Sequence, residues 1–288
     1  MDIKPAQVKE LRERTGAGMM DCKKALVEAA GDIDQAAELL RKAGQAKADK
    51  KASRIAAEGQ VVIATDQAQG RFAILEVNSE TDFVANDENF RAFADTVGKA
   101  VLDNAPADVN ALMQLPADGG TLEDARLGLV TKVGENIAVR RFDLLDSDGV
   151  IGAYVHMNRI GVLVELEGGD ADLARDLAMQ VAATSPLYVS VDDVPAAERD
   201  KEREILSAQA AQEGKPPEIV AKMIEGRLRK HFDEVTLLGQ PFVKNPDQRV
   251  RDLLAANKAS VRRFLRYAVG EGIEKKADNF AEEVAALR

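Results

Sequence analysis

A pattern of two strands joined by a short loop and followed by a helix occurs twice in this sequence. The apolar runs that predict strands lie at 61–64 and 72–77, and again at 150–155 and 160–166. Helical patterns follow the two pairs at 87–102 and 171–183. The repeat predicts a core of two related hairpin-plus-helix subdomains, and mixed strands with segregated helices place the chain in the α+β class.

The N-terminal part has a different period. Helical patterns span 5–14 and 19–30, and a third helix begins after Asp32, with turn signals at 15–18 and at Gly31 between them. Three helices this short predict a small bundle. The Ala/Lys-rich stretch 44–54 that follows is typical of an exposed linker, whether helical or not.

Further elements are predicted around the repeat. A helix capped by Thr121 runs to 133, strands are expected at 137–144 and 261–267, and a short amphipathic helix is expected at 278–287. Two charged helices at 196–213 and 217–230, with Gly214 as a stop, predict a helical hairpin that projects from the body as an arm. Its thin apolar stripe consists of Ile205, Ile219, Met223 and Leu228.

These elements predict four parts. They are a bundle with its linker at 1–54, a first core subdomain at 55–145, a second at 146–270 that includes the arm 196–230, and a C-terminal helical module at 271–288.

Charge and composition exclude several classes of function. The net charge is −10, yet residues 1–54 hold 12 Lys and Arg against 9 Asp and Glu. An acidic body with a mildly basic head suits a protein partner and poorly suits nucleic acid, whose binders rely on many basic side chains. Aromatic residues are only 4% and Trp is absent, which also disfavours base stacking.

Nothing in the sequence indicates a membrane or secreted protein. No apolar run approaches the roughly 20 residues of a spanning helix, and the N-terminus lacks the pattern of a signal peptide. The single cysteine, Cys22, cannot form an internal disulfide or, without a Cys/His cluster, a zinc site. We therefore expect a cytoplasmic protein without a bound metal.

The sequence also lacks the motifs of an enzyme or a nucleotide-binding protein. No phosphate-binding G-x-x-x-x-G-K-[ST] loop and no G-x-G-x-x-G after a strand occurs. The two histidines, His156 and His231, stand in different units without a nucleophile constellation. We expect no catalytic residues, no cofactor and no nucleotide site of its own.

One segment stands out, at the end of the second strand of the first copy. Thr81, Asp82, Phe83 and Val84 place a large aromatic ring at a strand-to-helix corner beside a charge. The residue types alone favour a ring that folds back into the core, because buried phenylalanine is the norm.

Several segments resemble those of a known family. Residues 81–84 resemble the T-D-F-V signature of the bacterial elongation factor Ts family, and 11–26 resemble its N-terminal signature. Segments 159–163, 239–243 and 269–275 fall where the family has similar ones, so the resemblance extends along the whole chain. One departure is Met157-Asn158, where the family often has smaller residues.

The resemblance implies a fold and a function. It implies a ubiquitin-associated-like bundle, two related core subdomains, a helical-hairpin arm and a C-terminal helix. It implies guanine-nucleotide exchange on elongation factor Tu, with release of GDP through disturbance of that partner's magnesium site. Phe83 would enter an apolar pocket of the partner, with Asp82 as its polar neighbour.

The resemblance also implies further contacts with the partner, less specifically than it implies the contact at Phe83. Lys9 and Arg12 of the basic head would hold the nucleotide domain, and the region of His156 would hold another domain. Met19 and Met20 are further candidates, although the residues favour the bundle core for both. The alternative function is a ribosome-associated or chaperone-like adaptor that binds a polypeptide through these methionines. It leaves the corner at 81–84 unexplained.

Overall fold

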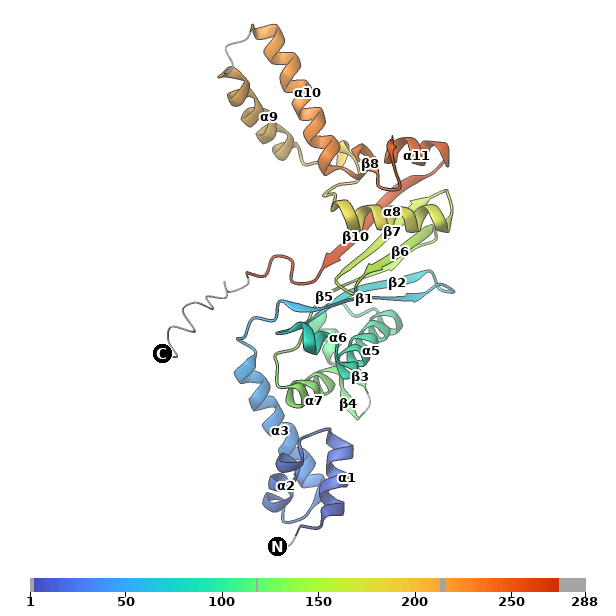
Figure 1. Cartoon of the computed structure of the whole chain (residues 1–288). Coiled ribbons are helices and arrows are strands. Elements are labelled where there is room, and N and C mark those ends of the chain that lie inside the picture. The colour runs from blue at the N-terminus through green and yellow to red at the C-terminus, as the bar shows by residue number, and fades with distance from the viewer. Residues whose placement is uncertain (1–2, 118, 213–215, 275–288) are drawn as a thin grey trace. The chain divides into compact units, whose positions relative to one another are not determined.

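A computed structural model of the chain describes residues 3–117, 119–212 and 216–274 (Figure 1). The chain divides into two compact units, one formed by residues up to Leu145 together with the segment from Tyr267, the other by residues 146–266. Each unit is described by itself. Both mix helices and strands, which confirms the α+β class.

The first unit begins with three helices. These are α1 (Pro5–Thr15), α2 (Met19–Glu28) and α3 (Ile33–Lys51). Gly16 ends α1 in a left-handed conformation (φ 66°), and the Asp32 side chain caps α3 by accepting hydrogen bonds from the N–H groups of Asp34 and Gln35. Leu11, Cys22, Leu26 and Ala36 form the buried centre of the bundle.

Helix α3 corrects the predicted linker. It continues to Lys51, and Ala48 is buried in the core of the first unit. At Gly44 a Cβ would lie only 3.0 Å from Thr131 Oγ1 of α7 (Leu122–Val133). Gly44 and Ala48 therefore pack against the first unit, whereas most of the other described side chains in the stretch are exposed, as predicted.

A three-stranded sheet forms the centre of the first unit. Strand β2 (Arg71–Ser79) lies between β1 (Glu58–Asp66) and β5 (Ala138–Asp146), and β1 pairs with β2 in antiparallel register. Helix α5 (Glu88–Asn104) packs on the sheet through Phe90, Val97 and other apolar residues. The hairpin and its helix agree with the first copy of the repeat.

The second unit repeats this arrangement. Strand β7 (Ile160–Glu167) lies between β6 (Val150–His156) and β10 (Ser260–Ala268), and α8 (Ala171–Thr184) packs on the hairpin. The repeat therefore extends beyond the predicted hairpin and helix, because each sheet also has a third strand. These third strands carry the same run of four residues, Val139-Arg140-Arg141-Phe142 and Val261-Arg262-Arg263-Phe264.

Two helices of the second unit, α9 (Ala196–Ala211) and α10 (Pro217–Val235), form the hairpin (Figure 1). The predicted apolar stripe is partly wrong, because Ile205 and Ile219 are exposed. Leu228 of the predicted stripe is buried, and the helices meet through it together with Leu206 and Phe232. On α9 the buried position is Leu206, one residue from the predicted Ile205. Gly214 and the predicted helix at 278–287 lie outside the described residues.

The remaining elements are short. They are α4 (Asp82–Ala85), α6 (Val109–Met113), β3 (Pro116–Ala117), β4 (Gly120–Thr121), η1 (Val191–Asp193), η2 (Leu237–Gly239), β8 (Pro241–Phe242), β9 (Asn245–Arg249) and α11 (Val250–Ala256). Within the described residues, no helix is both long and apolar enough to cross a bilayer.

Candidate functional site

The corner that follows β2 is a single helical turn, α4, with an exposed aromatic ring. Thr81 caps the turn through its hydroxyl, which accepts a hydrogen bond from the N–H of Val84 at 3.4 Å. The ring of Phe83 is 84% exposed, so the core position that the residue types favour is wrong. Asp82 is exposed beside it, while Val84 packs against the core of the unit.

The start of the corner is held by a residue that the sequence reasoning missed. The carboxylate of Glu135 accepts hydrogen bonds from the backbone N–H groups of Glu80 (3.1 Å) and Thr81 (3.0 Å). Its other oxygen accepts one from the Thr81 hydroxyl at 2.7 Å. Glu135 lies far along the chain from these partners, so no local pattern indicates the contact.

The end of the corner is also tied to the sheet. Gln60 on β1 is buried, and its side-chain amide donates to the carbonyl oxygen of Ala85 at 2.6 Å. Thr81 and Ala85 are thus both fixed from outside the turn. The exposed ring of Phe83 projects from a short segment that is held at both ends.

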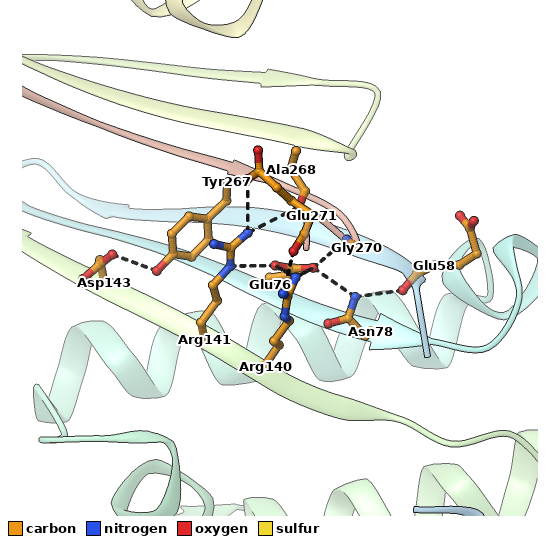
Figure 2. Close-up of polar contacts among 10 residues, drawn as sticks. All are labelled: Glu58, Glu76, Asn78, Arg140, Arg141, Asp143, Tyr267, Ala268, Gly270 and Glu271. Carbon is orange, nitrogen blue, oxygen red and sulfur yellow. Dashed lines mark hydrogen bonds and ion pairs between the residues drawn. The ribbon is translucent and has the colours of Figure 1, made fainter. Parts of the chain in front are cut away.

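A buried carboxylate lies on the same strand that leads into the corner (Figure 2). Glu76 of β2 is inaccessible to solvent and accepts hydrogen bonds from Arg140 and Arg141 of β5 and from the backbone N–H of Gly270. Burial would raise the pKa of Glu76, but hydrogen bonds from Gly270, Asn78 and the two arginines together hold that pKa below its ordinary value. Glu76 is therefore a structural anion that joins the sheet to the C-terminal segment.

Tyr267 closes this cluster from the other side. Its hydroxyl donates to Asp143 at 2.7 Å, and the guanidinium of Arg141 lies 4.0 Å from the centre of its ring. Burial and the hydrogen bond to Asp143 raise the pKa of Tyr267. The phenol stays protonated and acts as a donor, which is a structural role.

The other predicted contact residues lie on separate elements. Lys9 and Arg12 are exposed on α1, where Lys9 pairs with Glu13 at 3.7 Å. Met19 and Met20 at the start of α2 are 60% and 64% exposed. Their predicted place in the bundle core is wrong, and they leave an apolar surface on the head.

His156 lies at the end of β6 in the second unit. Its ring nitrogen Nδ1 is 3.0 Å from the hydroxyl of Tyr154. The turn beyond it is closed by a hydrogen bond from the N–H of Arg159 to the carbonyl of His156, and both middle residues have positive φ (Met157 49°, Asn158 57°). This is the type I′ pattern of tight hairpins, and it leaves the side chain of Met157 exposed.

The corner offers an exposed surface for binding. The hydroxyl of Thr81 is used in capping the turn and in its hydrogen bond to Glu135. The described residues contain no group of His, Cys, Asp and Glu arranged to hold a metal ion. An exposed ring on a fixed turn can insert into an apolar pocket of another protein.

Comparison with known proteins shows which proteins this chain resembles along its length. Residues 80–271 match the family model described as Elongation factor TS. The chain is 60% identical to an elongation factor Ts from Thioalkalivibrio sulfidiphilus, over 99% of this chain and 98% of the relative. It is 56% identical to those of Halorhodospira halophila and Legionella pneumophila, over the same shares of each chain.

Proposed function

Because the chain belongs to the elongation factor Ts family, a family of guanine-nucleotide exchange factors for elongation factor Tu, we propose that Phe83 is the residue that drives the exchange. The observation that carries the proposal is the 84% exposed ring of Phe83 on a turn fixed at both ends. The ring enters an apolar pocket of the partner's nucleotide domain, and the resulting shift disturbs the magnesium site and releases GDP.

The neighbours of Phe83 have supporting roles in this proposal. Thr81 caps the turn, Val84 anchors it in the core, and Asp82 is the polar residue beside the ring. Exchange of this kind requires negative coupling, in which the factor weakens GDP binding and GDP weakens binding of the factor by the same ratio.

Phe83 cannot provide all of the free energy. Burying one phenylalanine side chain gives about 1.5–3 kcal/mol, which corresponds to roughly one to two powers of ten in affinity. Further surfaces must bind the partner. We assign this role to Lys9, Arg12, Met19 and Met20 on the head and to the region of His156 on the second unit, which are exposed.

The proposal also states which activities and partners the protein lacks and in which compartment it acts. The protein catalyses no covalent step, binds no nucleotide of its own, and has neither nucleic acid nor a membrane as its partner. It acts in the cytoplasm, where polypeptides are elongated.

One observation favours the alternative function, an adaptor that binds a polypeptide. Met19, Met20 and Val27 of α2 are all more than half exposed, and together they offer apolar surface. An adaptor of this kind would bind unfolded peptides and leave GDP release from elongation factor Tu unchanged, so the experiment below separates the two functions.

The experiment compares release of fluorescently labelled GDP from elongation factor Tu in stopped flow, with the wild type, Phe83→Ala and Leu187→Ala. Leu187 is the matched control, an apolar side chain that is 67% exposed on the other unit. We expect Phe83→Ala to slow release at least about tenfold, the factor that corresponds to losing part of one buried aromatic contact. Leu187→Ala should release GDP like the wild type.

Stability of the free protein is the second measurement. Phe83→Ala should change the free energy of unfolding by less than about 1 kcal/mol, as for exposed positions. A loss of about 3–5 kcal/mol with normal release per folded molecule would place Phe83 in a core and contradict the proposal.

A further inference from the structure

We propose that Glu135 is a positioning residue for nucleotide exchange, which acts by holding the turn that carries Phe83. The inference rests on the proposed role of Phe83. Glu135 would not need to touch the partner, because its effect passes through the orientation of the ring.

The contacts of Glu135 are concentrated on Glu80 and Thr81, three and two residues before Phe83. Its carboxylate accepts from the N–H groups of Glu80 and Thr81 and from the Thr81 hydroxyl, at 3.1, 3.0 and 2.7 Å. All three are hydrogen bonds to a charged acceptor, the stronger kind. The Thr81 hydroxyl also accepts from Val84, so Glu135 sets the orientation of the group that caps α4.

The loop that carries Glu135 is itself fixed. Gly134 ends α7 in a left-handed conformation (φ 81°), and its carbonyl oxygen accepts a hydrogen bond from Lys51 at the end of α3. The N–H of Asn136 donates to the Glu80 carboxylate at 2.6 Å, and the Asn136 side chain donates to the carbonyl of Arg54 at 2.9 Å.

The two loops therefore hold each other in a reciprocal arrangement. Glu135 accepts from the backbone of Glu80 and Thr81, and Glu80 accepts from the backbone of Asn136. Each segment presents a carboxylate to the N–H groups of the other. The orientation of the corner is thus set by a loop 54 residues farther along the chain.

The corner needs this external support for a physical reason. Helix α4 has four residues, far fewer than a helix requires to be stable by itself. The exposed ring of Phe83 makes few packing contacts that could hold it in place. If the turn populates several orientations, only the fraction with the ring correctly aimed can act, and exchange slows by that fraction.

Two substitutions at Glu135 separate its possible roles. Glu135→Ala removes all three hydrogen bonds. Glu135→Gln can keep them, because the amide oxygen can accept from the two backbone N–H groups while the amide NH₂ donates to the Thr81 hydroxyl. The glutamine variant loses the charge and reverses the direction of the bond to the Thr81 hydroxyl, which donates to Glu135 in the wild type.

The experiment measures the rate of labelled GDP release at saturating factor, together with the factor concentration at half saturation. We expect Glu135→Ala to lower the saturated rate about tenfold, the equivalent of one hydrogen bond to a charged group. Glu135→Gln should stay within about threefold of the wild type, since charge assistance roughly doubles such a bond. The half-saturating concentration should change less than the rate, because the other contact surfaces remain.

A double-mutant cycle tests whether Glu135 acts through Phe83. In the Phe83→Ala background, Glu135→Ala should change the release rate less than about twofold, since the ring that it positions is gone. Asp108→Ala is the matched control. Asp108 caps α6 of the same unit by accepting from the N–H of Ala111 at 2.8 Å, and its loss should lower stability without slowing release.

A spectroscopic measurement follows the ring directly. The chain contains no tryptophan, so Phe83→Trp introduces a single indole. In that background, Glu135→Ala should speed the local component of the fluorescence anisotropy decay, and Glu135→Gln should not.

The outcomes are distinguishable. If Phe83→Ala releases GDP at the wild-type rate, the proposed function of Phe83 is wrong, and the role of Glu135 falls with it. If Phe83→Ala slows release but Glu135→Ala does not, or if the two effects multiply in the double variant, only the inference about Glu135 is wrong.

Discussion

The two units of this protein build the same sheet and leave its central strand in different ways. In both units the central strand carries a buried glutamate that faces two consecutive arginines of the third strand. Glu76 contacts Arg140 and Arg141, and Glu165 contacts Arg262 and Arg263. The shared arrangement indicates a structural role, since it is present in both copies.

The difference begins where the central strand ends. After β7 the chain passes through Gly168 and Gly169, both with positive φ, and enters α8 with Asp170 as its cap. After β2 the same connection contains the additional turn α4 with its exposed Phe83. The Gly-Gly connection only turns the chain, whereas the connection after β2 exposes the ring of Phe83, which we propose binds the partner.

This comparison separates the fold from the function. The sheet, its helix and its Glu–Arg–Arg cluster are common to both units, whereas the exposed ring that we propose for binding lies on a connection that only the first unit has. Three predictions test how far the likeness of the two units goes.

The largest expected effect concerns the two buried glutamates. Glu76→Ala should lower the free energy of unfolding by about 3–5 kcal/mol, because it leaves two arginines without their buried partner. Glu165→Ala should cost about 1–2 kcal/mol, because the side chains of Arg262 and Arg263 are 42% and 53% exposed and regain water. Urea unfolding of each variant provides the measurement. Equal losses would mean that the clusters are energetically the same.

The second prediction concerns the loss of stability when the glycine at the contact between helix and sheet is replaced in each unit. Gly152 on β6 lies so close to α8 that a Cβ would meet the backbone of Ala174 at 2.1 Å, so Gly152→Ala should destabilise by about 2–3 kcal/mol. In the first unit Gly98 is on the helix, and its Cβ would meet the side chains of Ala64 and Leu75 at 3.2 and 3.3 Å. Gly98→Ala should change stability by less than about 1 kcal/mol, because the gain in helix propensity offsets the crowding. Thermal unfolding of both variants checks the contrast, which a small loss for Gly152→Ala would remove.

The smallest effect is expected in acid. Burial acts against ionisation of both glutamates, but hydrogen bonds to the arginines and their neighbours hold the pKa of Glu76 and of Glu165 below the ordinary value. The unfolded chain therefore binds these protons more tightly. The stability is fully present above the ordinary glutamate pKa of about 4.3 and is lost as pH falls through the lower pKa of the folded state.

Replacement by glutamine should make stability less dependent on pH in this acidic range. Unfolding measured from neutral pH downward should give a shallower loss for Glu76→Gln and for Glu165→Gln than for the wild type. A slope unchanged in either variant would show that the carboxylate in that unit does not contribute to acid unfolding.

Much of the fold could be predicted from local pattern. The two hairpins and their helices follow from alternating and helical periods, and the caps Asp32 and Thr121 follow from residue types that favour helix starts. A repeated run of residues marks the third strand of each repeat, but the prediction of the repeat did not use it. The run Val-Arg-Arg-Phe occurs in both, at 139–142 and 261–264.

The prediction failed where neighbours in space decide burial. Residue types favoured the core for Phe83, Met19 and Met20, but all three side chains are exposed. The stretch 44–54 was predicted to be exposed, yet Ala48 is buried against the first unit. Composition indicates whether a side chain can be buried, and only the packed structure decides whether something covers it.

The sequence by itself determined the family, the order of elements and the segment 81–84 as the candidate contact, because these depend on short patterns and on residue identity. Only the tertiary structure decided that Phe83 points into solvent and that Glu135 holds its turn. Glu135 and Thr81 are 54 residues apart in sequence, and their contact depends on how the loop after α7 meets the corner after β2. A hydrogen bond of this kind is set by distance in space, and no period or motif of the chain records it.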